Sequence, residues 1–287
     1  PPRAAQDMPL GLAVRLFGEL RQMGTSLVVL QGQGEPLLHP RVLEFITSAK
    51  ASGLQVMLLS NGTLIDRPTA EMLVQSGLDT LKVTLWASDR EQYLANYPGC
   101  DPANLQRALD GLSLLAASKK ARRVRHPEVW VHRPLNSTNY RSSVALVELA
   151  HSLGCDGVSF SPLFSPRGKA DRFSLQGDEL SETLSELRHA RQRLANLGLK
   201  QAVDRALLRF ARGQEAWQRT PCYIAWYHAR RDVGTTVGSF LTRRIRWRCG
   251  RLTYELERVP LRKLWNWVAT EAAMYLRPDR SWGMPTT

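Results

Sequence analysis

A short apolar run, Val28–Leu30, leads within a few positions to Gln33, Gly34 and Glu35. An apolar run followed by glycine, a carboxylate and then a helical pattern predicts a strand, a tight turn and a helix start. Glycine lets a ligand approach the backbone closely, and free amides or carbonyls at such a turn can hold a zwitterion. A generic strand-to-helix turn has the same composition, so both interpretations stay open.

Two further apolar runs end in side chains that could bind a polar ligand. Ser60 and Asn61 precede Gly62 at the end of one run, and Thr84 lies near the end of the next. Asn-Gly favours a turn with positive φ, which is a purely structural explanation for the first. A strand threonine that bonds to backbone is the structural explanation for the second. If the strands are parallel, all three ends meet at one edge, where ligands bind.

The elements that must position these residues alternate between strand and helix. Apolar runs predict strands at Ser26–Gln31, Leu54–Ser60, Thr80–Leu85, Glu128–Arg133 and Gly157–Ser161. Helical spacing predicts helices at Pro9–Met23, Arg41–Ser52, Arg67–Ser76, Asn104–Ser118, Tyr140–Leu153, Asp178–Leu197 and Leu261–Leu276. Alternation with near-continuous apolar strands predicts an α/β fold with a parallel sheet, either a barrel or a doubly wound sheet.

Composition and charge divide the chain in two. The alternation fails after about residue 215, which predicts a domain over residues 1–214 and an irregular extension over residues 215–287. The net charge is +13, and Arg219 to Lys263 holds eleven Lys or Arg against three Asp or Glu. This bias fits a solvated tail or an acidic partner, nucleic acid included. The uncharged stretches are shorter than the roughly 18 apolar residues of a membrane span, so no membrane partner is expected.

The cysteines do not form a local motif. They are Cys100, Cys155, Cys222 and Cys249, and the closest two, 222 and 249, are 27 positions apart. No CxxC pair exists, which argues against a local zinc or redox site. Isolated thiols without a recognisable export signal fit a reducing, cytoplasmic compartment.

Read together, the strand ends resemble the radical S-adenosylmethionine (SAM) superfamily. The turn at Gln33–Pro36 resembles that family's "GGEP" strand end, which grips the amino group of SAM. Residues 60–62 resemble its "TNG" segment, and residues 82–88 resemble its "KVSLWAS" strand. The resemblance covers residues 8–165. It implies a partial (β/α)6 TIM-like barrel, SAM and a [4Fe–4S] cluster as cofactors, and SAM contacts from the residues Gln33, Gly34, Glu35, Ser60, Asn61 and Thr84.

The family's CxxxCxxC loop is not in these 287 residues. In the family its thiolates hold the cluster, and one electron from the cluster splits SAM into a radical that abstracts hydrogen from substrate. Pro2-Arg3 and Met8-Pro9 resemble the segment that follows this loop in many relatives. The resemblance therefore implies a fragment that begins after the loop, lacks the first barrel strand and is inactive by itself. A reductant such as flavodoxin or ferredoxin is the implied electron donor.

The segment that begins at Pro221-Cys222 resembles the opening of a SPASM-type extension, which normally carries auxiliary iron–sulfur clusters. By that resemblance Cys222 is a ligand of an auxiliary cluster, but one or two cysteines cannot hold a cluster, and a free buried thiol explains it equally. The expected "PCC" pair is missing, and Cys249 matches nothing in the extension. Many relatives with this extension modify peptides, which makes a peptide or protein the implied substrate.

Two non-enzymatic alternatives remain at this point. A relative that lost its cluster could bind a peptide or act as a partner protein. A basic nucleic-acid-binding protein could use the interleaved Arg243, Arg244, Arg246, Trp247 and Arg248 as a stacking platform. No recognised nucleic-acid motif accompanies these residues, so nucleic acid is the least favoured partner.

Overall fold

The structure is a computed structural model that describes residues 8–22, 24–31, 34–163 and 173–211. The predicted boundary at residues 214 and 215, the extension over 215–287 and the predicted helix Leu261–Leu276 lie outside the described residues. So do Gln33, Cys222, Cys249 and the predicted basic platform at residues 243–248.

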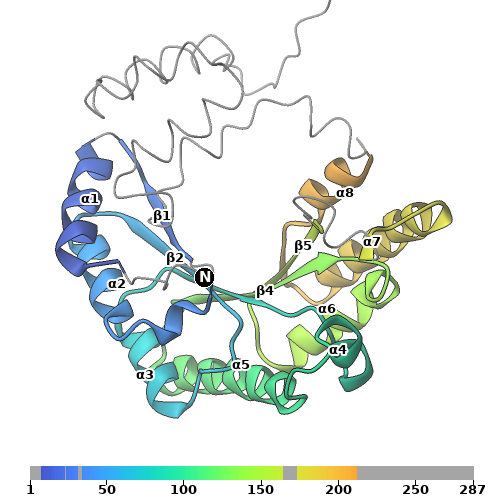
Figure 1. The fold of residues 1–287 in the computed structure, drawn as a ribbon, viewed down its shortest axis with the longest axis horizontal. Coiled ribbons are helices and arrows are strands. Elements are labelled where there is room, and N and C mark those ends of the chain that lie inside the picture. The colour runs from blue at the N-terminus through green and yellow to red at the C-terminus, as the bar shows by residue number, and fades with distance from the viewer. Residues whose placement is uncertain (1–7, 23, 32–33, 164–172, 212–287) are drawn as a thin grey trace, which may run out of the picture. The chain divides into compact units, whose positions relative to one another are not determined.

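A parallel sheet forms the centre of the described fold. Its strands follow the chain in order, so that each pairs with the next: β1 (Leu27–Leu30), β2 (Gln55–Ser60), β3 (Thr80–Thr84), β4 (Glu128–Leu135), β5 (Gly157–Pro162) and β6 (Lys200–Gln201). Figure 1 shows β1 to β5 on an arc with helices along its outer side, and the sheet does not close. The predicted α/β fold with parallel strands is confirmed. β6 was not predicted, because two residues carry no periodicity.

Helices connect the strands, and most lie where helical spacing predicts them. The observed helices are α1 (Leu10–Gln22), α2 (Val42–Ala51), α3 (Arg67–Gln75), α4 (Arg90–Asn96), α5 (Ala103–Arg122), α6 (Ser143–Ser152), α7 (Asp178–Asn196) and α8 (Val203–Ala211), with short 3-10 turns η1 (Pro36–Leu38) and η2 (Tyr140–Ser142). The sequence analysis did not predict α4 or α8. The side chain of Asp89 caps the start of α4 by accepting a hydrogen bond from Gln92 N at 2.8 Å. No described helix is both long and apolar enough to cross a membrane.

The two faces of the sheet differ in burial. Side chains that alternate toward the helices are fully covered, as Leu58, Leu81, Val131 and Val158 are, each 0% exposed. The opposite face, called the inner face below, is partly exposed and carries Met57, Leu59, Lys82, Thr84, Trp130, His132, Ser159 and Ser161. The strands are therefore apolar on their helix-facing side, and polar residues occupy much of the inner face.

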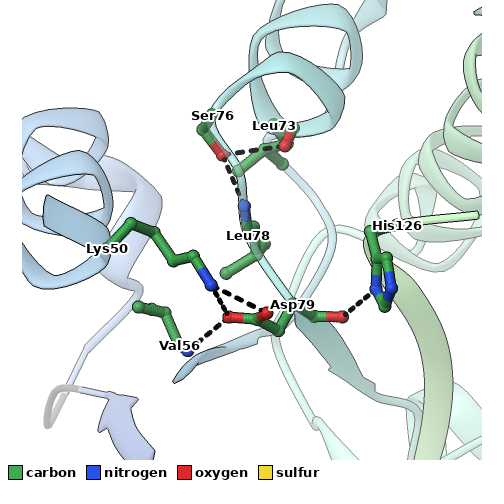
Figure 2. A network of polar contacts seen from close by, with 7 residues as sticks. All are labelled: Lys50, Val56, Leu73, Ser76, Leu78, Asp79 and His126. Carbon is green, nitrogen blue, oxygen red and sulfur yellow. Dashed lines mark hydrogen bonds and ion pairs between the residues drawn. The ribbon is translucent and has the colours of Figure 1, made fainter. Parts of the chain in front are cut away.

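One polar arrangement occurs twice at the amino ends of the strands. In Figure 2, the carboxylate of Asp79, just before β3, accepts hydrogen bonds from Val56 N at 2.7 Å and from Lys50 Nζ at 2.7 Å. Asp156, just before β5, repeats this with Val129 N at 2.7 Å and with Lys119 Nζ. Each aspartate side chain thus connects the backbone of one strand to a lysine of a helix.

The backbone completes both copies. Asp79 N donates to the carbonyl of the same Val56, and its own carbonyl accepts from Glu128 N of β4. Asp156 N likewise donates to Val129, and its carbonyl accepts from Lys200 N of β6. Each aspartate therefore binds the strand before it and the strand after it, which sets the register at this edge.

Candidate functional site

The turn after β1 is tied to the end of β2 by one carboxylate. Glu35 Oε1 accepts hydrogen bonds from Ser60 Oγ at 2.8 Å and from Leu37 N at 3.1 Å, and Glu35 Oε2 accepts one from Asn61 N at 2.7 Å. Hydrogen bonds to a charged acceptor contribute more than neutral ones. The carboxylate therefore caps η1 and holds two strand ends together.

Ser60, Asn61 and Gly62 form a compact turn beside that carboxylate. Ser60 Oγ accepts a hydrogen bond from Gly62 N at 2.9 Å, and Asn61 Oδ1 accepts one from Thr63 N at 2.9 Å. Gly62 has φ of +79°, and a Cβ there would lie 2.8 Å from Val83 Cγ1. Both the positive φ and this close approach require glycine, so the turn is as the Asn-Gly pair predicts.

Backbone near the Glu35 turn is open to a ligand. Gly34 is exposed, and a Cβ added to it would meet no described atom within 4 Å. The side chain of Glu35, by contrast, already has three protein donors. A ligand at this turn would therefore meet backbone groups of the turn, whose position the carboxylate sets.

Thr84 lies at the same edge of the sheet, at the end of β3, the strand next to β2. It ends β3, opposite His132 of β4, and its side chain belongs to the inner face. Its hydroxyl has no hydrogen-bond partner among the described residues, so it remains available. The predicted set is thus brought together in part: Gly34, Glu35, Ser60 and Asn61 form one cluster, Thr84 lies on the next strand of the same edge, and Gln33 lies outside the described residues.

Arg133, at the predicted end of the strand Glu128–Arg133, has a structural role. It is 0% exposed, and its guanidinium donates to Leu85 O at 3.2 Å, Ser142 O at 3.0 Å and Ser88 Oγ at 2.6 Å. Burial lowers its pKa to about 9, and the charge of Asp89 partly offsets this. It holds the segment after β3 against the start of α6.

His132 is an inner-face residue outside the predicted set of SAM contacts. Its Nδ1 lies 2.9 Å from Ser159 Oγ, and its Nε2 lies 3.2 Å from Ser161 Oγ. Burial, and next the positive charge of Lys82, lower its pKa to about 4. The imidazole is therefore neutral at pH 7. The alternation of polar and buried residues along β3, and the position of His132 on the matching face of β4, is the signal that could have found it.

The described residues do not supply a ligand set for an iron–sulfur cluster. No group of three or more His, Cys, Asp or Glu side chains among them could hold a metal ion. Cys155 is buried, and burial raises the pKa of its thiol to about 12, so it stays protonated and is a poor metal ligand. Cys100 is exposed and stands alone. The described part of the chain therefore does not fit the cluster.

Comparisons with known proteins agree with this geometry. The family model described as "Radical SAM superfamily" matches residues 1–121. AdoMet-dependent heme synthase of Methanosarcina barkeri is 28% identical over 178 residues, which cover 62% of this chain and 46% of that protein. GTP 3′,8-cyclase of Chlorobaculum tepidum is 36% identical over 94 residues, which cover 32% of this chain and 28% of that protein. The chain thus spans less than half the length of these relatives.

A solved structure shares the fold. Streptococcus suis SuiB bound to precursor peptide SuiA superposes with a TM-score of 0.52 and 16% sequence identity, covering 67% of this chain and 40% of that one. Residues 1–121 of the chain thus match the radical SAM superfamily, and the described parallel sheet shares the fold of this solved structure.

Proposed function

We propose that the protein of which this chain is part is a radical SAM enzyme, and that SAM binds at the carboxyl ends of β1, β2 and β3. The observation that carries the proposal is the Glu35 carboxylate. Its hydrogen bonds from Ser60 and Asn61 join two strand ends next to Gly34, where an added Cβ would meet no described atom within 4 Å. Ligands of parallel α/β folds bind at this edge.

In this proposal the residues of the chain bind and orient SAM. Backbone groups at Gly34 hold its amino acid portion, Glu35 and Ser60 keep the turn in place, and Asn61 and Thr84 contact the ligand from β2 and β3. When both cofactors are bound, SAM and a [4Fe–4S] cluster supply radical initiation by one-electron reductive cleavage. The cluster has no ligand set in the described residues, so cysteines elsewhere in the protein, and a reductant such as flavodoxin or ferredoxin, belong to the proposal.

The substrate we propose is a peptide or protein. Support comes from SuiB, whose fold this sheet shares and which binds a precursor peptide. The auxiliary-cluster role of Cys222 also remains a proposal, since that residue lies outside the described part of the chain.

The second function that we propose is partner binding without catalysis, by a relative of the family that has lost its cluster. The observation in its favour is that no described group of side chains could hold a metal ion. Sequencing the coding DNA upstream of the Pro1 codon, in frame, separates the two. An upstream CxxxCxxC supports the enzyme, whereas a start codon or unrelated sequence there supports the binding protein.

Calorimetric titration of the chain with SAM tests the site itself. We expect saturable binding that Glu35→Gln weakens about tenfold, because removing the charge of a partly buried acceptor of several hydrogen bonds costs about 1.5 kcal/mol. Glu44→Gln is the matched control, since Glu44 pairs only with Arg41 on the surface of α2. Equal loss in both variants, or no SAM binding at all, would contradict the proposed site.

A further inference from the structure

Helix α5 ends in a cluster of exposed cations that continues into the connection to β4. This cluster is called the α5 basic end below, and its members are Lys120, Arg122, Arg123 and Arg125. No Asp or Glu lies between Asp110 and Glu128, so the cluster has no acidic neighbour along the chain. Within the described ranges none of its side chains forms an ion pair.

The carboxylates at the starts of the neighbouring strands already have partners. Asp156, just before β5, accepts hydrogen bonds from Lys119 Nζ and from Val129 N. Glu128, the first residue of β4, pairs with Lys200 Nζ and accepts a hydrogen bond from the Trp130 indole at 3.2 Å. These carboxylates therefore do not neutralise the α5 basic end, whose like charges repel one another.

The backbone at this helix end places an arginine where other helices of the fold have glycine. Arg123 has φ of +55°, its N–H donates to Lys120 O at 3.1 Å, and Val124 N donates to Lys119 O at 3.1 Å. The same pair of hydrogen bonds ends α2, α6 and α7, but there the residue with positive φ is Gly53, Gly154 or Gly198. A side chain in this left-handed conformation costs stability, and glycine avoids that cost.

The connection that follows Arg123 also differs from its counterpart before β5. Residues 124–127 separate Arg123 from β4, whereas only residues 155–156 separate Gly154 from β5. Val124 is 42% exposed, while Cys155, at the equivalent position after Gly154, is 4% exposed. An apolar residue at this position normally packs against the helix that it follows. The longer connection instead leaves an apolar side chain exposed among cations.

The polarity of the helix explains only part of this cluster. Cations in the last turn of a helix interact favourably with its free carbonyl groups, which accounts for Lys120 and Arg122. That effect falls off beyond the last turn, so it does not account for Arg125. It also does not explain why the position with positive φ is occupied by Arg123. A side chain that is kept at a strained position indicates that the side chain is used.

We propose that the α5 basic end, together with Val124, binds an acidic segment of a partner polypeptide. Guanidinium groups pair with carboxylates through two parallel hydrogen bonds, and Val124 supplies an apolar contact among them. Residues 111–127 contain no Phe, Tyr or Trp, so this surface lacks the rings on which nucleic-acid bases stack. The surface adjoins the amino end of β4, whereas the proposed SAM site lies at carboxyl ends of strands. The proposal is therefore independent of the radical SAM function.

Fluorescence anisotropy of the full chain with a labelled peptide, glutamates around a central leucine, tests this surface. We expect binding that salt weakens, and that the triple variant Arg122→Gln/Arg123→Gln/Arg125→Gln weakens about tenfold. The charge-matched control is a triple variant that removes exposed arginines of α3, α4 and α7, Arg67→Gln/Arg90→Gln/Arg188→Gln. Long-range charge alone should make the control bind less than about threefold more weakly.

A single substitution separates the binding role of Arg123 from its effect on the fold. Arg123→Gly should raise the urea midpoint of unfolding, because glycine adopts a positive φ without steric cost. The same variant should bind the acidic peptide about twofold more weakly, because one cation is lost. A variant that is more stable and yet binds less tightly cannot owe its lost affinity to unfolding.

Four outcomes would overturn the proposal. They are no binding of the acidic peptide, equal binding of a peptide with glutamine in place of glutamate, equal weakening by the two triple variants, or binding of a single-stranded oligonucleotide in place of the peptide. Equal weakening would assign the peptide to the basic residues between Arg219 and Lys263, and the last outcome would assign the surface to nucleic acid. Absence of SAM binding would leave all these results unchanged, so the two proposals can fail separately.

Discussion

The two edges of the sheet are built in different ways. At the amino edge one arrangement occurs twice: Asp79 and Asp156 each accept a hydrogen bond from a lysine and one from a backbone amide, and the amide distance is 2.7 Å in both. At the carboxyl edge the polar arrangement is not repeated: the hydrogen bonds that Glu35 accepts from Ser60 and Asn61 occur at one place. Repetition with balanced charge indicates a role in stability, and single use beside open backbone indicates a ligand site.

Charge balance separates the regions further. The amino-edge lysines Lys50 and Lys119 both have an aspartate partner. On the inner face, Lys82 lies over the ring of Trp130 and forms no ion pair with a carboxylate among the described residues. Unbalanced charge costs stability, so it is maintained where a ligand or a reaction uses it. The comparison therefore yields predictions of opposite kinds for the two regions.

The largest expected effect is at the amino edge. Asp156→Ala leaves Lys119, whose side chain is 10% exposed, without its partner, and leaves Val129 N without its acceptor. Breaking a buried pair in this way costs about 3–5 kcal/mol, and the partial exposure of Asp156 places this case near the lower value. Urea unfolding measures the loss. Glu44→Ala, at a solvent-exposed pair, should cost much less.

One outcome of this unfolding experiment would contradict the prediction. If Asp156→Ala and Glu44→Ala destabilised the fold equally, the repeated arrangement would have no special role in stability. The SAM affinity of the folded Asp156 variant should equal that of the wild type, because the site lies at the other edge.

The second effect is a pH dependence centred on the inner face. The pKa of His132 falls from an ordinary 6.5 to about 4 on folding. Between these values the unfolded chain binds a proton that the folded chain does not, so stability falls as the pH is lowered from about 6.5 to 4. The total is about 3.5 kcal/mol, since the pKa falls by about 2.5 and one pKa unit corresponds to about 1.4 kcal/mol.

Urea unfolding from pH 4 to 7 measures this slope, and His132→Gln isolates it. The difference between the wild type and this variant should grow steadily toward pH 7, since other titrating groups cancel in the subtraction. A constant difference across the range would mean that His132 titrates normally in the folded protein.

Much of this fold could be predicted from local pattern. Apolar runs and helical spacing locate β1 to β5, and the Gly34–Glu35 and Ser60–Asn61 pairs fall at strand ends that the topology then brings together. The role of Glu35 could not be predicted this way. Its carboxylate binds groups 25 and 26 positions away, and only the pairing of β1 with β2 makes them neighbours.

The two charge arrangements were missed for different reasons. Both aspartates follow a helix-ending glycine and one apolar residue, in Gly77–Asp79 and Gly154–Asp156, so a short repeated signal was present but is too brief to notice alone. Helix α8, which the helical pattern did not predict, lies against β5. Lys82 and His132 were each read as part of an apolar strand, because buried neighbours flank them.

The smallest effect separates the two edges most cleanly, because two serines make nearly the same contacts. Ser60 Oγ donates to Glu35 and accepts from Gly62 N at 2.9 Å; Ser76 Oγ, drawn in Figure 2, donates to Leu73 O and accepts from Leu78 N at 3.3 Å. Ser60→Ala and Ser76→Ala should each cost about 1 kcal/mol of unfolding free energy. Calorimetry should show weaker SAM binding for Ser60→Ala alone, since that substitution loosens the turn under Gly34. Matching losses of SAM affinity in both variants would mean that a general loosening of the sheet, and not the Glu35 tether, controls binding.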